Sequence, residues 1–219
     1  MSKENFKIEV QRQKNCHSVR LKIGKNGEPI LTLPFWIPLK IGLLWANKQQ
    51  SWIQKNSFIP NRFHEGQKIL FLGEEVIIQH SSKHCQTHLE NGILWVSGDI
   101  SFLPRRVADF IKKEFLPYLQ KGVLEKEKLL NVKHTRLTLR DTSSRWGSCS
   151  SGGALCFCWR LAMAPEFVID YMIAHEVSHL KHMNHSVAFW KTVAELSPHT
   201  YVAKKWLKDH GNNLPVVKI

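Results

Sequence analysis

The sequence predicts an α+β fold with a mostly β N-terminal half and an α+β C-terminal half. Residues 6–34 and 67–97 alternate apolar and polar side chains around short turn sequences, as β-hairpins do. Residues 165–183 repeat apolar side chains at helical spacing, which is typical of an amphipathic helix. We therefore expect a mainly β region over residues 1–100 and a second region over residues 101–219.

In the N-terminal half, three turn sequences and one helical stripe define the expected elements. Asn26-Gly27 and Asn91-Gly92 suit two-residue hairpin turns because both central positions need positive φ, and a third turn is expected at Gly73-Glu74. A helix is expected over 38–55, with Pro38 in its first turn. Its apolar positions fall roughly on one stripe: Ile41, Leu44, Trp45, Trp52 and Ile53.

The C-terminal half is expected to open with a helix over 104–130, which Pro117 kinks or breaks. Strands are expected over 135–140 and 154–163, since both segments alternate apolar and other side chains. Prolines and a glycine then bound three further helices. We expect these helices over 165–183, 186–196 and 199–209.

Composition limits the class of protein. Of the 219 residues, 43% are hydrophobic, which is enough for a packed core. The sequence contains no run of eighteen apolar residues, the length that a membrane-spanning helix needs. The start has no apolar leader segment, so the cytoplasm is the expected location. The net charge of +13 allows weak association with nucleic acid. Five cysteines without a CxxC pair are expected to be free thiols: Cys16, Cys85, Cys149, Cys156 and Cys158.

The pattern with the most specific chemistry is His175-Glu176-Val177-Ser178-His179. On a helix, the two histidines stand one turn apart on the same face, where a single zinc ion can bridge them. Glu176 then lies beside the metal and can take a proton from the metal-activated water.

A third ligand must come from elsewhere in the chain. His182 is on the same face, but seven residues separate it from His175, or roughly 10 Å along a straight helix. We favour His185, which follows Asn184, a residue that tolerates the left-handed conformation at which many helices end. Glu195 in the next helix is the alternative. His182 is then expected to be exposed or to support a ligand.

Two functions fit these residues. The first is a zinc metallopeptidase with one Zn²⁺ per chain, in which Glu176 acts as general base on a peptide or protein substrate. The second is a non-catalytic nucleic-acid-binding domain with a structural zinc site. Structural zinc sites have four protein ligands and need no adjacent acid. Three good ligands and a carboxylate in the position of a base favour the peptidase.

The C-terminal motifs resemble those of the YgjP-like metallopeptidases, a family related to SprT-like and minigluzincin-type zinc proteases. The shared stretches are RWGSCS at 145–150, WRL at 159–161, AP-x-x-VIDY at 164–171, HExxH, and NHS-x-x-FW at 184–190. The resemblance implies a zincin-like domain in which His175, His179 and His185 bind zinc and Glu176 is catalytic. It also implies that the active-site helix lies beside an antiparallel sheet. The strand over 155–161 is then next to that helix, where an edge strand pairs with substrate backbone.

Several residues near these motifs keep more than one interpretation. Arg145 either packs a loop beneath the site or orients the substrate or an oxyanion. Cys149 is not favoured as a nucleophile, because a zinc-water mechanism needs none. Cys156, Cys158 and His182 depart from the family pattern without removing a ligand.

Overall fold

The computed structural model describes residues 8–14, 16–24, 28–56, 63–82, 86–142, 145–211 and 214. Contacts divide the chain into two compact units, and the division falls between Asn61 and Arg62. We expected a boundary near residue 100. The strands before residue 100 instead share one hydrophobic core with the helices and strands that follow, so they belong to the second unit.

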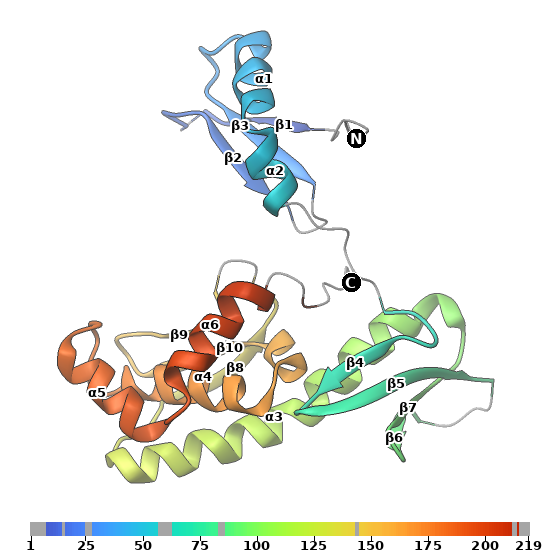
Figure 1. The fold of residues 1–219 in the computed structure, drawn as a ribbon, viewed down its shortest axis with the longest axis vertical. Helices are drawn as coiled ribbons and strands as arrows, with labels where there is room; N and C mark the ends of the chain where they lie inside the picture. Colours follow the sequence, from blue (N-terminus) through green and yellow to red (C-terminus); the bar gives the residue numbers. More distant parts are fainter. Residues whose placement is uncertain are drawn as a thin grey trace. The chain divides into compact units, whose positions relative to one another are not determined.

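The first unit is a three-stranded sheet covered by a short helix (Figure 1). Its strands are β1 (Glu9–Arg12), β2 (Arg20–Ile23) and β3 (Pro29–Leu33), with β3 in the middle, parallel to β1 and antiparallel to β2. The predicted turn at Asn26-Gly27 lies outside the described residues.

The helix expected over 38–55 is two helices, α1 (Leu39–Lys48) and α2 (Gln50–Asn56). Most of its predicted apolar stripe faces outward. Ile41 and Leu44 are 58% and 57% exposed, whereas Gly42 and Ala46 are buried, and a Cβ on Gly42 would lie 2.5 Å from the Leu33 side chain. Small residues thus define the packed face, because helix and sheet approach closely there.

The second unit begins with a four-stranded sheet in the order β4-β5-β7-β6. The turn between β4 (Lys68–Phe71) and β5 (Glu74–Ser81) is Leu72-Gly73, one residue earlier than predicted, and both residues have positive φ. The turn between β6 (His88–Glu90) and β7 (Ile93–Ser97) is Asn91-Gly92, as predicted.

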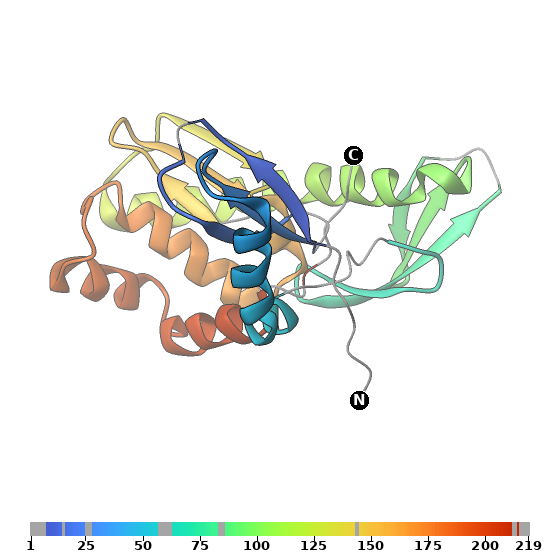
Figure 2. The same cartoon turned by 90° about the horizontal axis from the view of Figure 1, so that it is seen from above.

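Helix α3 (Leu103–Leu130) connects this sheet to the rest of the unit (Figures 1 and 2). The helix continues through Pro117, so the predicted break does not occur. Buried side chains lie on both sides of the proline, including Phe115 and Leu119. Their packing stabilises the helix despite the backbone hydrogen bond that proline cannot make.

The third sheet has the order β8-β10-β9 and is mixed rather than antiparallel. From β8 (Arg136–Arg140) the chain passes to β9 (Gly147–Cys149) at the far edge and then turns back into β10 (Ala154–Cys158). β10 is therefore parallel to β8 and antiparallel to β9. The strand predicted over 154–163 ends at Cys158, where a 3₁₀ helix (Trp159–Met163) begins.

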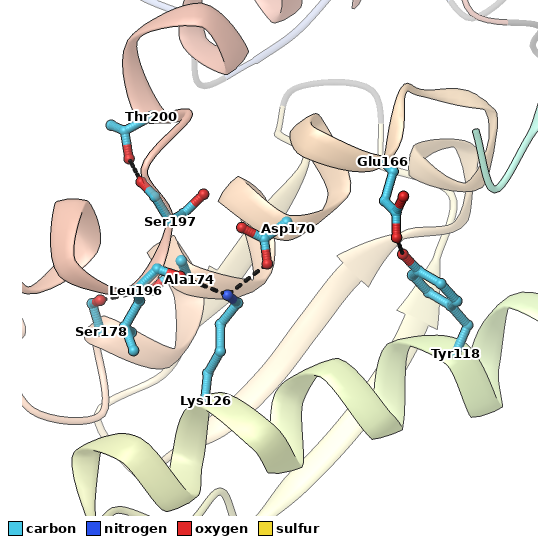
Figure 3. Close-up of polar contacts among 9 residues, drawn as sticks. All are labelled: Tyr118, Lys126, Glu166, Asp170, Ala174, Ser178, Leu196, Ser197 and Thr200. Atoms are coloured by element: carbon cyan, nitrogen blue, oxygen red, sulfur yellow. Dashed lines mark hydrogen bonds and ion pairs between the residues drawn. The ribbon is translucent and has the colours of Figure 1, made fainter.

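Three helices complete the unit: α4 (Glu166–Ser178), α5 (Val187–Leu196) and α6 (Thr200–His210). The buried lysine Lys126 fastens α3 to two of them (Figure 3). Its Nζ lies 2.6 Å from Asp170 Oδ1 on α4 and donates a 2.8 Å hydrogen bond to the carbonyl of Leu196 at the end of α5. Nearby, Tyr118 donates to Glu166 at 3.3 Å. No described helix is long and apolar enough to span a bilayer.

Candidate metal centre

Helix α4 places His175 and His179 one turn apart on one face. The helix ends at Ser178 rather than at the predicted residue 183, but His179 keeps helical backbone angles as the C-cap. The two imidazole rings are therefore neighbours, with centroids 5.0 Å apart.

A tight turn returns the chain so that His185 meets the other two histidines. The turn uses i→i−3 bonds, from Leu180 N to Val177 O and from Lys181 N to Ser178 O. Asn184 does not have the positive φ that we expected, because this 3₁₀ geometry ends the helix without a left-handed residue. Ser186 then caps α5.

The three imidazoles converge on a common point. One ring nitrogen from each of His175, His179 and His185 lies within 4.8 Å of the others. The Nε2 atoms of His175 and His185 are 3.3 Å apart. Two nitrogens bound tetrahedrally at about 2.05 Å from zinc would be separated by about 3.3 Å, so the His175–His185 pair has the spacing of two ligands of one ion.

The environment of His175 and His179 favours the neutral form of their rings, which is the form that binds metals. Burial, then the neighbouring histidines, lowers the pKa of His175 to about 4. Burial also lowers the pKa of His179. The Nδ1 of His179 donates to the carbonyl of His182 at 3.0 Å, which leaves its Nε2 as an acceptor.

Glu176 lies on the buried side of α4 and is 3% exposed. Burial raises the pKa of its carboxyl group to about 8, and the charge of Arg145 opposes that shift. The carboxylate packs on the backbone of Gly147 in β9, since a Cβ there would lie 2.5 Å from Glu176 Oε1. Only glycine leaves room for the carboxylate at this point of the strand.

Aromatic side chains from α5 support the histidines. The buried ring of Phe189 contacts all three imidazoles, at centroid distances of 5.0 Å to His175, 4.4 Å to His179 and 4.8 Å to His185. Trp190 stacks on His185, and Lys204 Nζ lies 4.1 Å from the Trp190 ring centre. In the sequence, Phe189 and Trp190 are identified only as the end of the NHS-x-x-FW stretch at 184–190.

Arg160 contacts described residues between β8 and β9. Its guanidinium contacts Asp141 and the carbonyl of Thr142, and it lies over the ring of Trp146. Arg145 itself is exposed at the start of β9. Burial, then the Glu176 charge, raises the pKa of Cys149 to about 11. That thiol is protonated near neutral pH, which agrees with our not assigning it as a nucleophile.

Two other candidate ligands lie outside the convergence point. His182 is half-buried and contributes its carbonyl to His179, while Glu195 is exposed on α5. Among the described residues, the possible metal ligands that lie together are the three histidines of the convergence point, and neither His182 nor Glu195 is one of them. Tyr171, whose hydroxyl lies 3.5 Å from His175 Nδ1, was missed, although its i−4 spacing from His175 could have identified it.

Within the third sheet, helix α4 packs chiefly on β9, and it also packs on the 3₁₀ helix that follows β10. The resemblance implied the strand over 155–161, which the structure divides between β10 and that 3₁₀ helix. β10 lies between two strands, so its backbone groups are already paired. Trp146 O accepts from Cys158 N at 2.8 Å, and Ser150 N donates to Ala154 O at 3.0 Å. The alternation of an antiparallel ladder therefore directs the backbone groups of Gly147 and Cys149 away from β10, to the outer edge.

Comparison with known proteins places the chain among the metallopeptidases. A model of the YgjP-like metallopeptidase domain matches residues 17–210, and the chain therefore belongs to the YgjP-like family.

Among solved structures, the chain is similar to the metallopeptidase zymogen abylysin of Pyrococcus abyssi, with 20% identity and a TM-score of 0.38 over 45% of this chain and 99% of that chain. The zymogen jannalysin of Methanocaldococcus jannaschii has 19% identity and a TM-score of 0.37 over 43% and 96%. No curated protein sequence gives a significant match.

Proposed function

We propose that the protein is a zinc-dependent metallopeptidase that binds one Zn²⁺ per chain through His175, His179 and His185. The observation that supports this most directly is the convergence of three imidazoles next to a buried glutamate, in a chain of a metallopeptidase family. A bound zinc ion would supply Lewis acidity toward water and toward the carbonyl of the scissile peptide bond.

Glu176 is the proposed general base. It follows His175 on α4, and its carboxylate is held in a dry position against Gly147. There it can take the proton of the attacking water and deliver it to the departing amine. Burial raises the pKa of this carboxyl group in the metal-free chain, and the positive charge of a bound cation would favour its ionised form, which is the form that accepts a proton.

We propose that an extended substrate pairs with the free edge of β9. The backbone N–H and C=O groups of Gly147 and Cys149 point to that edge, and Gly147 touches Glu176. A peptide that hydrogen-bonds there by β-augmentation would run beside the general base. Arg145, near the start of β9 and within electrostatic range of Glu176, is placed to orient the substrate or an oxyanion.

The alternative of a non-catalytic nucleic-acid-binding domain with a structural zinc is less well supported. A structural zinc site is closed by four protein ligands. In the described part of the chain, three histidines meet and the neighbouring carboxylate belongs to Glu176, which packs on β9.

The cytoplasm remains our proposed location. The cysteines in the described residues carry free thiols, as is usual in a reducing compartment. Thiol labelling of the protein in intact cells checks this, since oxidised cysteines would contradict it.

Digestion of a peptide library by the purified protein tests the proposed activity. The wild type should hydrolyse peptide bonds, lose activity to a chelator and regain it with zinc. Glu176→Gln should stay inactive under the same conditions. A Glu176→Gln protein that cleaves as fast as the wild type would overturn the assignment of the general base.

A further inference from the structure

The two faces of the β8-β10-β9 sheet differ in chemistry. Leu137 and Leu139 of β8 pack into the hydrophobic core, together with Leu155 and Phe157 of β10. Since side chains alternate along a strand, the other three residues of β8 project from the opposite face. These residues are Arg136, Thr138 and Arg140.

The face opposite the core is hollowed and basic. A hollow of about 410 Å³ is lined by three arginines, Arg136, Arg140 and Arg145, and by several hydroxyl groups, among them those of Thr138, Ser148 and Ser150. The described residues that line it include no aspartate or glutamate. The hollow extends to β9, the edge nearest the candidate metal centre.

The charges on this face are not neutralised within the described part of the chain. Arg136 and Arg140 are exposed, and neither forms an ion pair or a side-chain hydrogen bond with another described residue. Elsewhere in the same unit, Arg160 is paired with Asp141 and Arg105 with Asp109. The arginines of the hollow thus keep all their donors for a ligand.

We propose that this face binds the phosphate backbone of a nucleic acid. Arginine guanidiniums and neutral hydroxyl donors are the groups that usually contact phosphate oxygens. Arg136 and Arg140 lie four residues apart on a strand, or about 13 Å. At about 3.4 Å per nucleotide along one strand, that distance spans about four nucleotides. The net charge of +13 attracts a polyanion at long range.

The same observations favour nucleic acid over an acidic polypeptide. A nucleic acid carries a charge on every nucleotide, so both arginines find a phosphate in any register. A peptide would need acidic side chains at matching positions. No aromatic side chain is among the described residues that line the hollow. Contacts with the phosphate backbone rather than stacking on bases would therefore dominate, and binding would depend little on sequence.

Fluorescence anisotropy with the full-length, zinc-loaded protein tests this proposal. The probes are a labelled 20-nucleotide single strand, the corresponding duplex and a glutamate-rich peptide of equal charge, each titrated at several salt concentrations. The variant is Arg136→Gln/Arg140→Gln. The matched control is Arg105→Gln/Lys68→Gln, which removes two exposed charges from ion pairs elsewhere in the same unit. Circular dichroism checks that both fold.

The proposal predicts that the variant binds nucleic acid at least tenfold more weakly than the control. The slope of log K against log salt should also fall by about 1.4 to 1.8, the loss of two phosphate contacts. Equal affinities and slopes for variant and control would overturn it, as would tighter binding of the acidic peptide or no binding of nucleic acid at low salt. If the double variant does not fold, Arg136→Gln and Arg140→Gln are measured singly, and each should lower the slope by about 0.7 to 0.9 relative to the control. The result does not depend on peptidase activity.

Discussion

Two buried ionisable side chains differ in how their charge is compensated: Lys126, which packs against helix α4, and Glu176, which belongs to α4. Lys126 is 7% exposed, and its ammonium group lies 2.6 Å from a carboxylate and 2.8 Å from a carbonyl (Figure 3). Glu176 is 3% exposed, and the charge of Arg145 opposes the effect of burial on its pKa, with no ion pair to Glu176 among the described residues. The first arrangement fixes the position of α4, and the second leaves a carboxylate available for chemistry.

This difference distinguishes a side chain that stabilises the position of α4 from one that is proposed to take part in catalysis. A buried charge with close partners stabilises a geometry, because either partner alone would be costly to leave in place. A buried carboxylate without close partners has a raised pKa and a high tendency to exchange protons. Changes to Lys126 should therefore act on stability, and changes to Glu176 should act on rate.

Glu176→Gln should have the largest effect on rate. The amide keeps the shape of the side chain but cannot accept the proton, so peptide hydrolysis should fall by about 10²- to 10⁴-fold. Thermal stability should not fall, because the substitution removes a buried charge. Initial rates with a cleaved library peptide and a melting curve check the two expectations. A loss of stability equal to that of a Lys126 variant would remove the distinction.

Lys126→Met should have the largest effect on stability. It leaves Asp170 and the carbonyl of Leu196 without their ammonium partner, at a cost of about 3 kcal/mol. For a unit of this size, that corresponds to a fall in Tm of about 6 to 12 °C. The control is Lys121→Met on the exposed side of α3, which should shift Tm little. Asp170→Asn added to Lys126→Met should recover part of the loss.

Gly147→Ala should reduce the rate without removing the proposed zinc ligands. The added Cβ would meet Glu176 Oε1 at 2.5 Å, so the carboxylate has to move. We expect hydrolysis to fall by about 10- to 100-fold, since small displacements of a positioned group have costs of this size. Gly152→Ala is the control, because the nearest atom to its Cβ is 3.9 Å away. Equal rates for the two variants would contradict the role given to Gly147.

The pH dependence of stability should distinguish the metal-free wild type from metal-free Glu176→Gln. Burial raises the pKa of Glu176 from 4.5 to about 8, so the folded state binds this proton more tightly than the unfolded state. The wild type should therefore lose stability relative to Glu176→Gln as pH rises from about 4.5 to about 8. Denaturant melts at several pH values measure the difference, and a constant difference would contradict the raised pKa.

Local patterns in the sequence were sufficient to predict the elements around the site. Helical spacing placed His175 and His179 on one face, and the length argument that excluded His182 agrees with the turn that brings His185 back. The expected helices over 186–196 and 199–209 agree within one residue with the observed ones. Metal binding by the three histidines remains a prediction.

Features that depend on long-range contacts could not be predicted. The middle position of β10 depends on strands that are not consecutive, so an alternating pattern does not indicate it. Nothing local shows that Gly147 touches a carboxylate on α4. Lys126 lies three residues after the buried Val123 on the same face of α3, and this spacing indicates that its side chain is buried. The neighbouring lysines made that indication hard to recognise in the sequence.

The central claim is most directly tested by the zinc content of the purified wild type, Glu176→Gln, His185→Ala and His182→Ala, measured by mass spectrometry. We predict one zinc per chain in the wild type, Glu176→Gln and His182→Ala, and a sharp loss in His185→Ala. Full zinc in His185→Ala, or no zinc in any form after reloading without chelators, would contradict a metal site made by His175, His179 and His185.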